Sequence, residues 1–367
     1  MKSSFSLQQK FVTEIIEQNF DLSCFDKQNS FLIVDNYFKE NQYENQLSTY
    51  ISAMKFNDYD NIFWIEASEK NKKLETVLLI IDKIFTYFQG MVSRDMQIIA
   101  IGGGICLDIS SFCASIINRG CDLIIVPTTL LSMCDAGIGG KTGVNYKNLK
   151  NKIGSFYPAK KVIFDYRFLS TLSLQQLRDG YVELLKTILI LDRDFFLSKS
   201  SFFESNLRFN IFKCAQFKLK LCSSDLNDRY NRQLLNLGHT FGHILESLSD
   251  FKVSHGQAVY LGILMSLKYS YHLKKLSYIQ YKRLHNYFFS VCGKFIFKYE
   301  GENFHQKVKT LLLSDKKVIS STLTLILVTD ASIEKIYLNK DTDRKQINDL
   351  IDFIYDNLQL SKKEITD

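Results

Sequence analysis

The stretch QIIAIGGGICLD, residues 97–108, is typical of a strand that runs into a glycine turn and then into a helix. Successive glycines let backbone N–H groups approach a pyrophosphate closely, and the N-terminus of the next helix assists them. The stretch lacks the GxGxxG spacing of a dinucleotide fingerprint and the acidic residue expected ~20 positions downstream. By itself it is compatible with a nucleotide site or with a simple tight turn.

Further β-rich runs lie on both sides of this stretch and alternate with helical patterns. They are FLIVD (31–35), NIFWIE (61–66), DLIIVPTT (122–129) and KVIFD (161–165). This alternation predicts an α/β domain with a parallel sheet over residues 1–170.

Residues 171–367 show mainly helical periodicity and predict a mostly α-helical second domain. The expected helices cover residues 174–192, 209–223, 238–248, 257–274 and 279–291. One late run, STLTLILV (321–328), is either a strand or a buried insertion. A chain of 367 residues is long for one core, which also favours two domains.

Composition excludes several classes of protein. Hydrophobic residues make up 46% and charged residues 23% of the chain, as in ordinary soluble globular proteins. The net charge of +7 is spread out, which argues against a nucleic-acid stripe and suits a small anionic ligand. The eight cysteines form no CxxC pair, which favours reduced thiols and a cytoplasmic location. No apolar run approaches the ~18 residues that a membrane span needs.

A second informative stretch is LLNLGHTFGH (234–243), followed by SHG at 254–256. Together they contain His239, His243 and His255, half of the chain's histidines. A helix would present His239 and His243 on one face, and imidazole is the commonest transition-metal ligand in proteins. Upstream, Glu183 in GYVELLKT is a candidate for a further ligand, because two histidines and one glutamate form a known open zinc set.

Glu183 also lies one helical turn before Lys186, so a surface ion pair is the alternative interpretation. The flanking residues are apolar on nearly every side, and a buried pair is costly unless it binds something. The segment therefore favours a ligand site over a surface pair when it is taken together with the histidines.

The loop GIGGKTGVN (137–145) combines glycines with Lys141 and Asn145, and KNLKNK (147–152) adds further amines. It does not fit the P-loop pattern GxxxxGK[ST]. A flexible surface loop is the alternative, but these groups close to Pro127 and the threonines of VPTT suit a phosphorylated ligand.

Taken in order, these motifs resemble those of the 3-dehydroquinate synthases, within the sugar phosphate cyclases. The motifs are GGG…D, RG…VPTTLL…D…GGKTGVN…KN.IG.FY, G..E..K, R.LLNLGHTFGH and HG.AV, and they cover about three-quarters of the chain, from about Asp35 to Lys317. Each motif is weak alone, but the ordered set is highly specific. The resemblance implies an N-terminal NAD-binding domain and a C-terminal metal- and substrate-binding domain.

The resemblance also assigns roles to individual residues. It implies that Glu183, His239 and His255 bind Zn²⁺ or Co²⁺, and that His243 contacts the substrate phosphate. Residues that match substrate-pocket positions are Asp135, Lys141, Asn151, Lys186, Lys218, Arg232, Asn236 and Lys316, with Lys317 as the alternative to Lys316. Arg119 matches an arginine that reaches the neighbouring subunit's site, which implies a homodimer. Residues on NAD-contact positions are Asp35, Glu69, Lys72, Gly103, Gly104, Asp108, Thr128, Thr129, Lys150, Phe168 and Thr171.

The implied reaction converts a seven-carbon 3-deoxy keto-acid phosphate, 3-deoxy-D-arabino-heptulosonate 7-phosphate, to 3-dehydroquinate and phosphate in the shikimate route. NAD is recycled within each turnover, so no net oxidation occurs. The substrate's own phosphate can act as the base before it leaves.

Several residues depart from the family pattern. Leu107 and Ser111 replace glycines, Gln257 replaces the glutamate of HGEAV, Leu226 replaces a glutamate, and Ser173 replaces a proline. The first 30 residues are expected to lack the paired strands that open the fold. Gln257 is neutral and is expected to weaken the support of His255 or to change its basicity.

Three alternatives stay open. A sister cyclase acting on glucose 6-phosphate or sedoheptulose 7-phosphate typically has an acidic residue at the position of Asn236, although DAGIG (135–139) is unusual for a dehydroquinate synthase. Metal-dependent alcohol and glycerol dehydrogenases share the two-domain architecture but would not need Lys141, Asn151, Lys218 and Arg232 together. A non-catalytic binding protein would not need to keep all three metal ligands.

Overall fold

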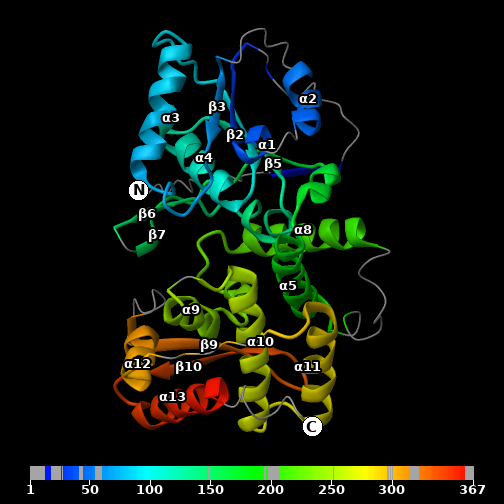
Figure 1. Cartoon of the computed structure of the whole chain (residues 1–367), viewed down its shortest axis with the longest axis vertical. Coiled ribbons are helices and arrows are strands. Elements are labelled where there is room, and N and C mark those ends of the chain that lie inside the picture. The colour runs from blue at the N-terminus through cyan, green and yellow to red at the C-terminus, as the bar shows by residue number, and fades with distance from the viewer. Residues whose placement is uncertain are drawn as a thin grey trace, which may run out of the picture. The chain divides into compact units, whose positions relative to one another are not determined.

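In the computed structural model, the chain folds into two compact units (Figure 1). Unit 1 comprises Met1–Leu177 with Arg208–Asp228, and unit 2 comprises Arg178–Leu207 with Arg229–Asp367. The structure describes residues 13–17, 26, 28–40, 44–53, 60–147, 149–193, 196, 206–250, 252–295, 297, 299, 301–314 and 322–359. Within these ranges, no helix has both the length and the hydropathy that crossing a bilayer requires.

Unit 1 is built on a six-stranded sheet in the order β1-β8-β5-β4-β2-β3, in which every neighbouring pair is parallel. Its strands are β1 (Glu14–Glu17), β2 (Ser30–Asp35), β3 (Ile62–Ile65), β4 (Gln97–Gly102), β5 (Asp122–Pro127) and β8 (Lys161–Phe164). The predicted parallel sheet is confirmed, and all five predicted runs form strands. The expectation that the first 30 residues lack paired strands is wrong, because β1 pairs with β8.

The remaining elements of unit 1 are helices and one short hairpin. They are α1 (Tyr37–Glu40), α2 (Glu44–Ala53), α3 (Leu74–Tyr87), α4 (Gly104–Ile116), the 3-10 helices η2 (Ile117–Arg119) and η4 (Tyr166–Thr171), the π-helix η3 (Ser132–Ala136), the hairpin β6 (Val144–Tyr146) and β7 (Leu149–Ile153), and α8 (Leu207–Ser224). The strands read as continuous apolar runs because both faces of a parallel sheet are covered. Residues 98–101 of β4 accordingly have no exposed surface.

The strand order places a topological switch between β2 and β4. After β2 the chain adds β3 on one side, then crosses to β4 and continues through β5 and β8 on the other. In open α/β sheets, ligands bind beyond the carboxyl ends of strands at such a switch. Here Asp35 ends β2, and Gly102 ends β4 just before the glycine turn.

Unit 2 is mainly helical. It contains most of α5 (Leu174–Leu191), η5 (Asn231–Asn236), α9 (His239–Leu248), α10 (His255–His272), α11 (Tyr278–Cys292), α12 (Phe304–Ser314), the antiparallel strands β9 (Thr322–Val328) and β10 (Ile333–Asn339), and α13 (Arg344–Gln359). The five predicted helical segments correspond to α5, α8, α9, α10 and α11. The run STLTLILV is a strand, and its partner β10 was not predicted.

The core of unit 2 gathers apolar side chains from α9, α10, α12, α13 and β9, with Leu245, Ala258 and Leu325 among its fully buried members. Gly238 precedes α9 with φ +81°, and a Cβ there would lie 2.7 Å from a side-chain carbon of Ile263. Only glycine allows both the left-handed backbone and the close packing of α9 on α10. The glycine of LNLGH therefore fixes where His239 begins its helix.

Candidate metal centre and nucleotide site

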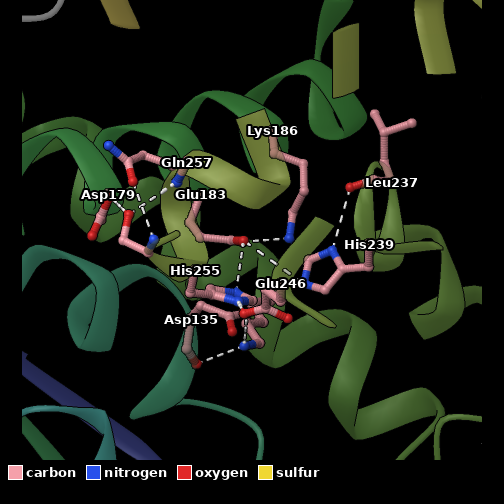
Figure 2. A network of polar contacts seen from close by, with 11 residues as sticks. Asp135, Asp179, Glu183, Lys186, Leu237, His239, Glu246, His255 and Gln257 are labelled. Atoms are coloured by element: carbon pink, nitrogen blue, oxygen red, sulfur yellow. Dashed lines mark hydrogen bonds and ion pairs between the residues drawn. The ribbon is translucent and has the colours of Figure 1, made fainter. Parts of the chain in front are cut away.

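Glu183 is at the centre of a polar cluster inside unit 2 (Figure 2). It lies on α5, where the flanking apolar residues bury it to 0% exposure, and Lys186 one turn later is 1% exposed. The Lys186 ammonium donates to Oε2 of Glu183. The surface ion pair considered from the sequence is therefore excluded, and Oε2 is engaged while Oε1 faces the histidines.

Two histidines face Glu183 with the same ring atom. Nε2 of His239 lies 3.8 Å from Glu183 Oε1, and Nε2 of His255 lies 3.6 Å from the same oxygen. Each histidine is the first residue of its helix, α9 or α10. Gly256 makes this approach possible, because a Cβ there would lie only 2.3 Å from Cα of Asp179 on α5.

The donor set fits a divalent transition metal. One ligand atom each from Glu183, His239 and His255 lies within 4.8 Å of the others. Two imidazoles and one carboxylate suit Zn²⁺ or Co²⁺ and leave a position for a substrate oxygen. The structure thus brings together the three residues that the family resemblance implies as ligands.

The second nitrogen of each histidine also has a protein neighbour. Nδ1 of His239 lies 3.4 Å from the carbonyl oxygen of Leu237, and Nδ1 of His255 lies 3.2 Å from Oε1 of Glu246 (Figure 2). Desolvation lowers the pKa of His255, but hydrogen bonds to Glu183 and Glu246 and the charges of these carboxylates outweigh it and raise the pKa to about 10.

Gln257 does not have the role that the sequence suggests. Its Oε1 accepts the Ser254 N–H at 3.1 Å, and its own N–H donates to Ser254 Oγ at 3.3 Å, which completes a capping box for α10. Ser254 Oγ also donates to Asp179 at 2.8 Å. The expected weakening of His255 support through Gln257 is corrected, because Glu246 provides that support.

The other predicted residues of unit 2 lie near these elements. His243 is exposed on α9, with its ring centre 5.6 Å from that of His239, and it is not part of the three-residue cluster. Arg232 is buried in η5, and Asn236 is the last residue of the same short helix. Lys316 and Lys317 lie outside the described residues.

Unit 1 contains two ion pairs among the predicted substrate residues. Lys218 on α8 donates to the carbonyl and the carboxylate of Asp135 in η3. Lys141 pairs with Asp228 at 2.6 Å. Arg119 is exposed at the end of η2 with φ +67°.

Several predicted NAD residues gather at the carboxyl ends of the central strands. Gly103 is the N-cap of α4 and Gly104 is its first residue, while Thr128 and Thr129 follow β5. Thr128 N–H donates to the Gly102 carbonyl at 3.0 Å, which ties the two strand ends together. This edge offers backbone N–H groups to an anionic ligand.

A buried lysine connects this edge to the hairpin. Lys72 donates to Asp108 on α4 at 2.5 Å and to Asn151 on β7 at 2.6 Å. Desolvation raises the pKa of Asp108, although Lys72 opposes the shift. Asn151, predicted as a substrate residue, therefore belongs to the same network as two predicted NAD residues.

The remaining predicted NAD residues differ in exposure. Glu69 accepts from Asn145 at 2.8 Å and lies 3.7 Å from the Lys150 ammonium, close to solvent. Phe168 has no exposed surface and packs against Phe38, with ring centres 5.1 Å apart. Thr171, also buried, donates to the Phe168 carbonyl at 2.7 Å.

The departures from the family pattern are accommodated locally. Leu107 and Ser111 are buried on α4. Ser173 Oγ accepts the N–H of Gln176 at 3.3 Å, and the Gln176 side chain accepts the Ser173 N–H at 2.9 Å, so this serine caps the start of α5. Nothing in the structure explains why Leu226 replaces the glutamate of the family pattern.

Two residues of these clusters, Glu246 and Asp228, were not predicted from the sequence. Glu246 lies seven residues after His239 and three after His243, a spacing that places all three on one helical face and could have indicated it. Asp228 is 87 positions from Lys141, and no sequence signal connects the two.

Comparisons with known proteins agree with this arrangement. Two family profiles match the chain, 3-dehydroquinate synthase N-terminal over residues 62–179 and 3-dehydroquinate synthase C-terminal over residues 180–318. The chain is 38% identical to 3-dehydroquinate synthase of Buchnera aphidicola subsp. Cinara cedri over 286 residues, which covers 75% of this chain and 76% of that protein. It is 35% identical to 3-dehydroquinate synthase of Clostridium tetani over 301 residues, or 79% and 78% of the two chains.

Solved structures share the fold. 2-Epi-5-epi-valiolone synthase from Streptomyces hygroscopicus subsp. jinggangensis, with NAD⁺ and Zn²⁺ bound, has a TM-score of 0.77 at 23% identity over 97% of this chain and 99% of that one. 2-Deoxy-scyllo-inosose synthase complexed with carbaglucose-6-phosphate, NAD⁺ and Co²⁺ has a TM-score of 0.75 at 21% identity, with coverage of 92% and 95%. At these identities the likeness concerns the fold alone.

Proposed function

Because the chain belongs to the 3-dehydroquinate synthase family, we propose that it converts 3-deoxy-D-arabino-heptulosonate 7-phosphate to 3-dehydroquinate and phosphate. The observation that carries this proposal is the cluster of Glu183, His239 and His255 beside Lys186, in which the carboxylate is buried and the two imidazoles are partly exposed. A buried carboxylate is costly unless it is paired, and the two imidazoles that face it complete a donor set for a cation.

The proposed cofactors are NAD in unit 1 and Zn²⁺ or Co²⁺ in unit 2. When bound, the metal would polarise an oxygen of the substrate's diol, and NAD would accept and return one hydride. The NAD assignment is supported by the glycine turn at the switch between β2 and β4, and by Asp35 at the end of β2. Relatives of the fold that contain NAD⁺ and Co²⁺ or Zn²⁺ support the same pairing.

The chain's own side chains would orient the substrate and control its charge. Lys186 balances the charge of Glu183 and holds one of its oxygens, which leaves the other for the metal. Lys141, Asn151 and His243 would hold the phosphate. The phosphate would take the C6 proton and leave as inorganic phosphate, with the electron pair of the C–H bond forming the new double bond.

The other substrate positions are proposals on the same basis. Asp135, Lys218, Arg232 and Asn236 would contact the substrate's polar groups, and Lys316 or Lys317 would complete the set. Residues 1–170 would form the NAD-binding domain and residues 171–367 the metal- and substrate-binding domain.

We also propose a homodimer in which Arg119 reaches the neighbouring subunit's site. Its exposure at the end of η2 is compatible with such a contact. A cytoplasmic location is supported by the cysteines: none of the seven in the described ranges is in a disulfide, and six of them are buried.

Phosphate release tests the proposal. Protein loaded with Zn²⁺ or Co²⁺ is incubated with the seven-carbon substrate and catalytic NAD, with and without a chelator. We expect chelator-sensitive phosphate release, dehydroquinate as product and no accumulation of NADH. Turnover of glucose 6-phosphate or sedoheptulose 7-phosphate instead would assign the chain to a sister cyclase, and net NADH formation from a simple alcohol would assign it to the dehydrogenases.

A further inference from the structure

Glu246 is a buried carboxylate that the proposed reaction does not use. It lies on α9 and is 8% exposed, and its Oε1 is 3.2 Å from Nδ1 of His255. We propose that Glu246 is a positioning residue, which holds His255 in the tautomer and orientation that present Nε2 to the metal. This inference rests on the proposed metal site, because it concerns how one of the three ligands is held there.

The two nitrogens of the His255 ring point to different carboxylates. Nδ1 faces Glu246, and Nε2 faces Glu183 Oε1 at 3.6 Å. When Nδ1 carries the proton and donates it to Glu246, the lone pair of Nε2 is left for a metal ion. A carboxylate acceptor also makes the imidazole a stronger ligand than a neutral acceptor does.

His239 provides an internal contrast. Its Nδ1 lies 3.4 Å from the main-chain carbonyl of Leu237, so its support is neutral and is set by the backbone. The contact of His255 with Glu246 thus differs in kind from this contact of His239, because its acceptor is a side-chain carboxylate. A single substitution at Glu246 can remove that support without changing any metal ligand.

Gln257 is the other residue that the sequence suggests as support for His255, but its side-chain oxygen is engaged at the start of α10. Its side chain accepts the Ser254 N–H at 3.1 Å and completes the cap of α10. It holds the start of the helix on which His255 lies, whereas Glu246 contacts the ring itself. Glu246, which contacts the His255 ring, and Gln257, which caps α10, can therefore be compared in one experiment.

The experiment compares the parent protein with Glu246→Gln and Gln257→Glu. Both substitutions preserve side-chain size, and glutamate at 257 can still complete the capping box. Zn²⁺ affinity is measured by competition with a chromophoric chelator, the visible spectrum of the Co²⁺-loaded protein reports the ligand set, and thermal unfolding of the metal-free protein reports the fold. We expect Glu246→Gln to bind Zn²⁺ 10- to 100-fold more weakly and to alter the Co²⁺ spectrum. Gln257→Glu should leave both unchanged.

Three outcomes would overturn the inference alone, and a fourth would overturn it together with the metal site. Equal Zn²⁺ affinity for Glu246→Gln and the parent would remove the positioning role while leaving the proposed function intact. An unaltered Co²⁺ spectrum in a Glu246→Gln protein that is only less stable would make the residue structural. A loss of affinity in Gln257→Glu as large as in Glu246→Gln would assign the support to the cap. A parent protein that binds no metal would instead refute the metal site itself, and this inference with it.

Discussion

Two lysine–carboxylate pairs, one from each unit, differ in their surroundings. In unit 1, Lys141 pairs with Asp228 at 2.6 Å, with side chains 50% and 19% exposed. In unit 2, Lys186 and Glu183 are 1% and 0% exposed. An exposed ion pair contributes little to stability, and its lysine can readily exchange the carboxylate for another anion. A buried pair stays together, because separating it leaves a desolvated charge without a partner. The first arrangement suits a residue that must release its partner to hold a phosphate, and the second suits a rigid metal centre.

The largest expected effect comes from removing a ligand in unit 2. His255→Ala should abolish tight Zn²⁺ binding and reduce kcat/KM on the order of 10³-fold or more, about 4 kcal/mol of transition-state stabilisation. NAD affinity, measured by fluorescence titration, should stay at the parent value because the predicted NAD residues all belong to unit 1. A variant that keeps chelator-sensitive turnover would show that His255 is not a ligand.

Removing the cation from the buried pair tests the comparison through stability. Lys186→Met removes the ammonium partner of the buried Glu183 and leaves the two histidine rings beside it, and we expect the metal-free protein to lose about 3 kcal/mol of unfolding free energy. Urea denaturation with and without Zn²⁺ measures this. The matched control is Lys141→Met, which should cost less than about 1 kcal/mol. Equal losses of unfolding free energy in the two variants would mean that burial does not determine how much each ion pair contributes to stability.

The sequence predicts a site well where local motifs form it, and less well where the packing of distant elements forms it. The edge beyond β2, β4 and β5 is formed by strand ends and glycines, which local patterns reveal, so the sequence placed Asp35, Gly103 and Thr128 at this edge together with the fold. Their contact with NAD stays a prediction. The residue types of Glu183, His239 and His243 indicated a metal site, the family resemblance put His255 in place of His243, and the structure brings Glu183, His239 and His255 together. Their geometry follows from the packing of α5, α9 and α10, which no local pattern encodes.

The side chains that were missed or misjudged lie beside predicted site residues. Glu246 and Asp228 are ordinary surface-type residues in sequence, and only the tertiary fold brings them to His255 and Lys141. Gln257 was misjudged because its position next to His255 in the sequence does not reveal that its side chain points back to Ser254. The strands β1 and β10 were missed because each is only partly buried, so its apolar pattern is weak.

A smaller effect is expected in unit 1 at the end of β4. A Cβ on Gly102 would lie 2.6 Å from Cβ of Cys106 and 3.2 Å from Cβ of Asp35. Gly102→Ala should therefore shift the turn and cost about 1–3 kcal/mol in unfolding free energy, with weaker NAD binding. Calorimetric titration with NAD measures the second effect. Zn²⁺ affinity is the control, and a parallel loss of Zn²⁺ affinity would contradict the separation of the two sites between the units.

The smallest effect is expected at Asp330, an exposed carboxylate of unit 2. It tests whether the contribution of a charged group to stability depends on its burial and not on the unit to which it belongs. Hydrogen bonds from the backbone N–H and the hydroxyl of Ser277, at the start of α11, hold the pKa of Asp330 below its ordinary value. A lowered pKa means that Asp330 stabilises the fold above the unfolded-state pKa of ~3.9, and that this contribution is lost as the pH falls through the folded-state value. Asp330→Asn should thus melt slightly below the parent at pH 7, and the difference should narrow below about pH 4. Melting curves at a series of pH values measure it. A deficit as large as that of Lys186→Met would show that solvent exposure does not weaken such contacts in unit 2, and the contrast with the buried pair would fail.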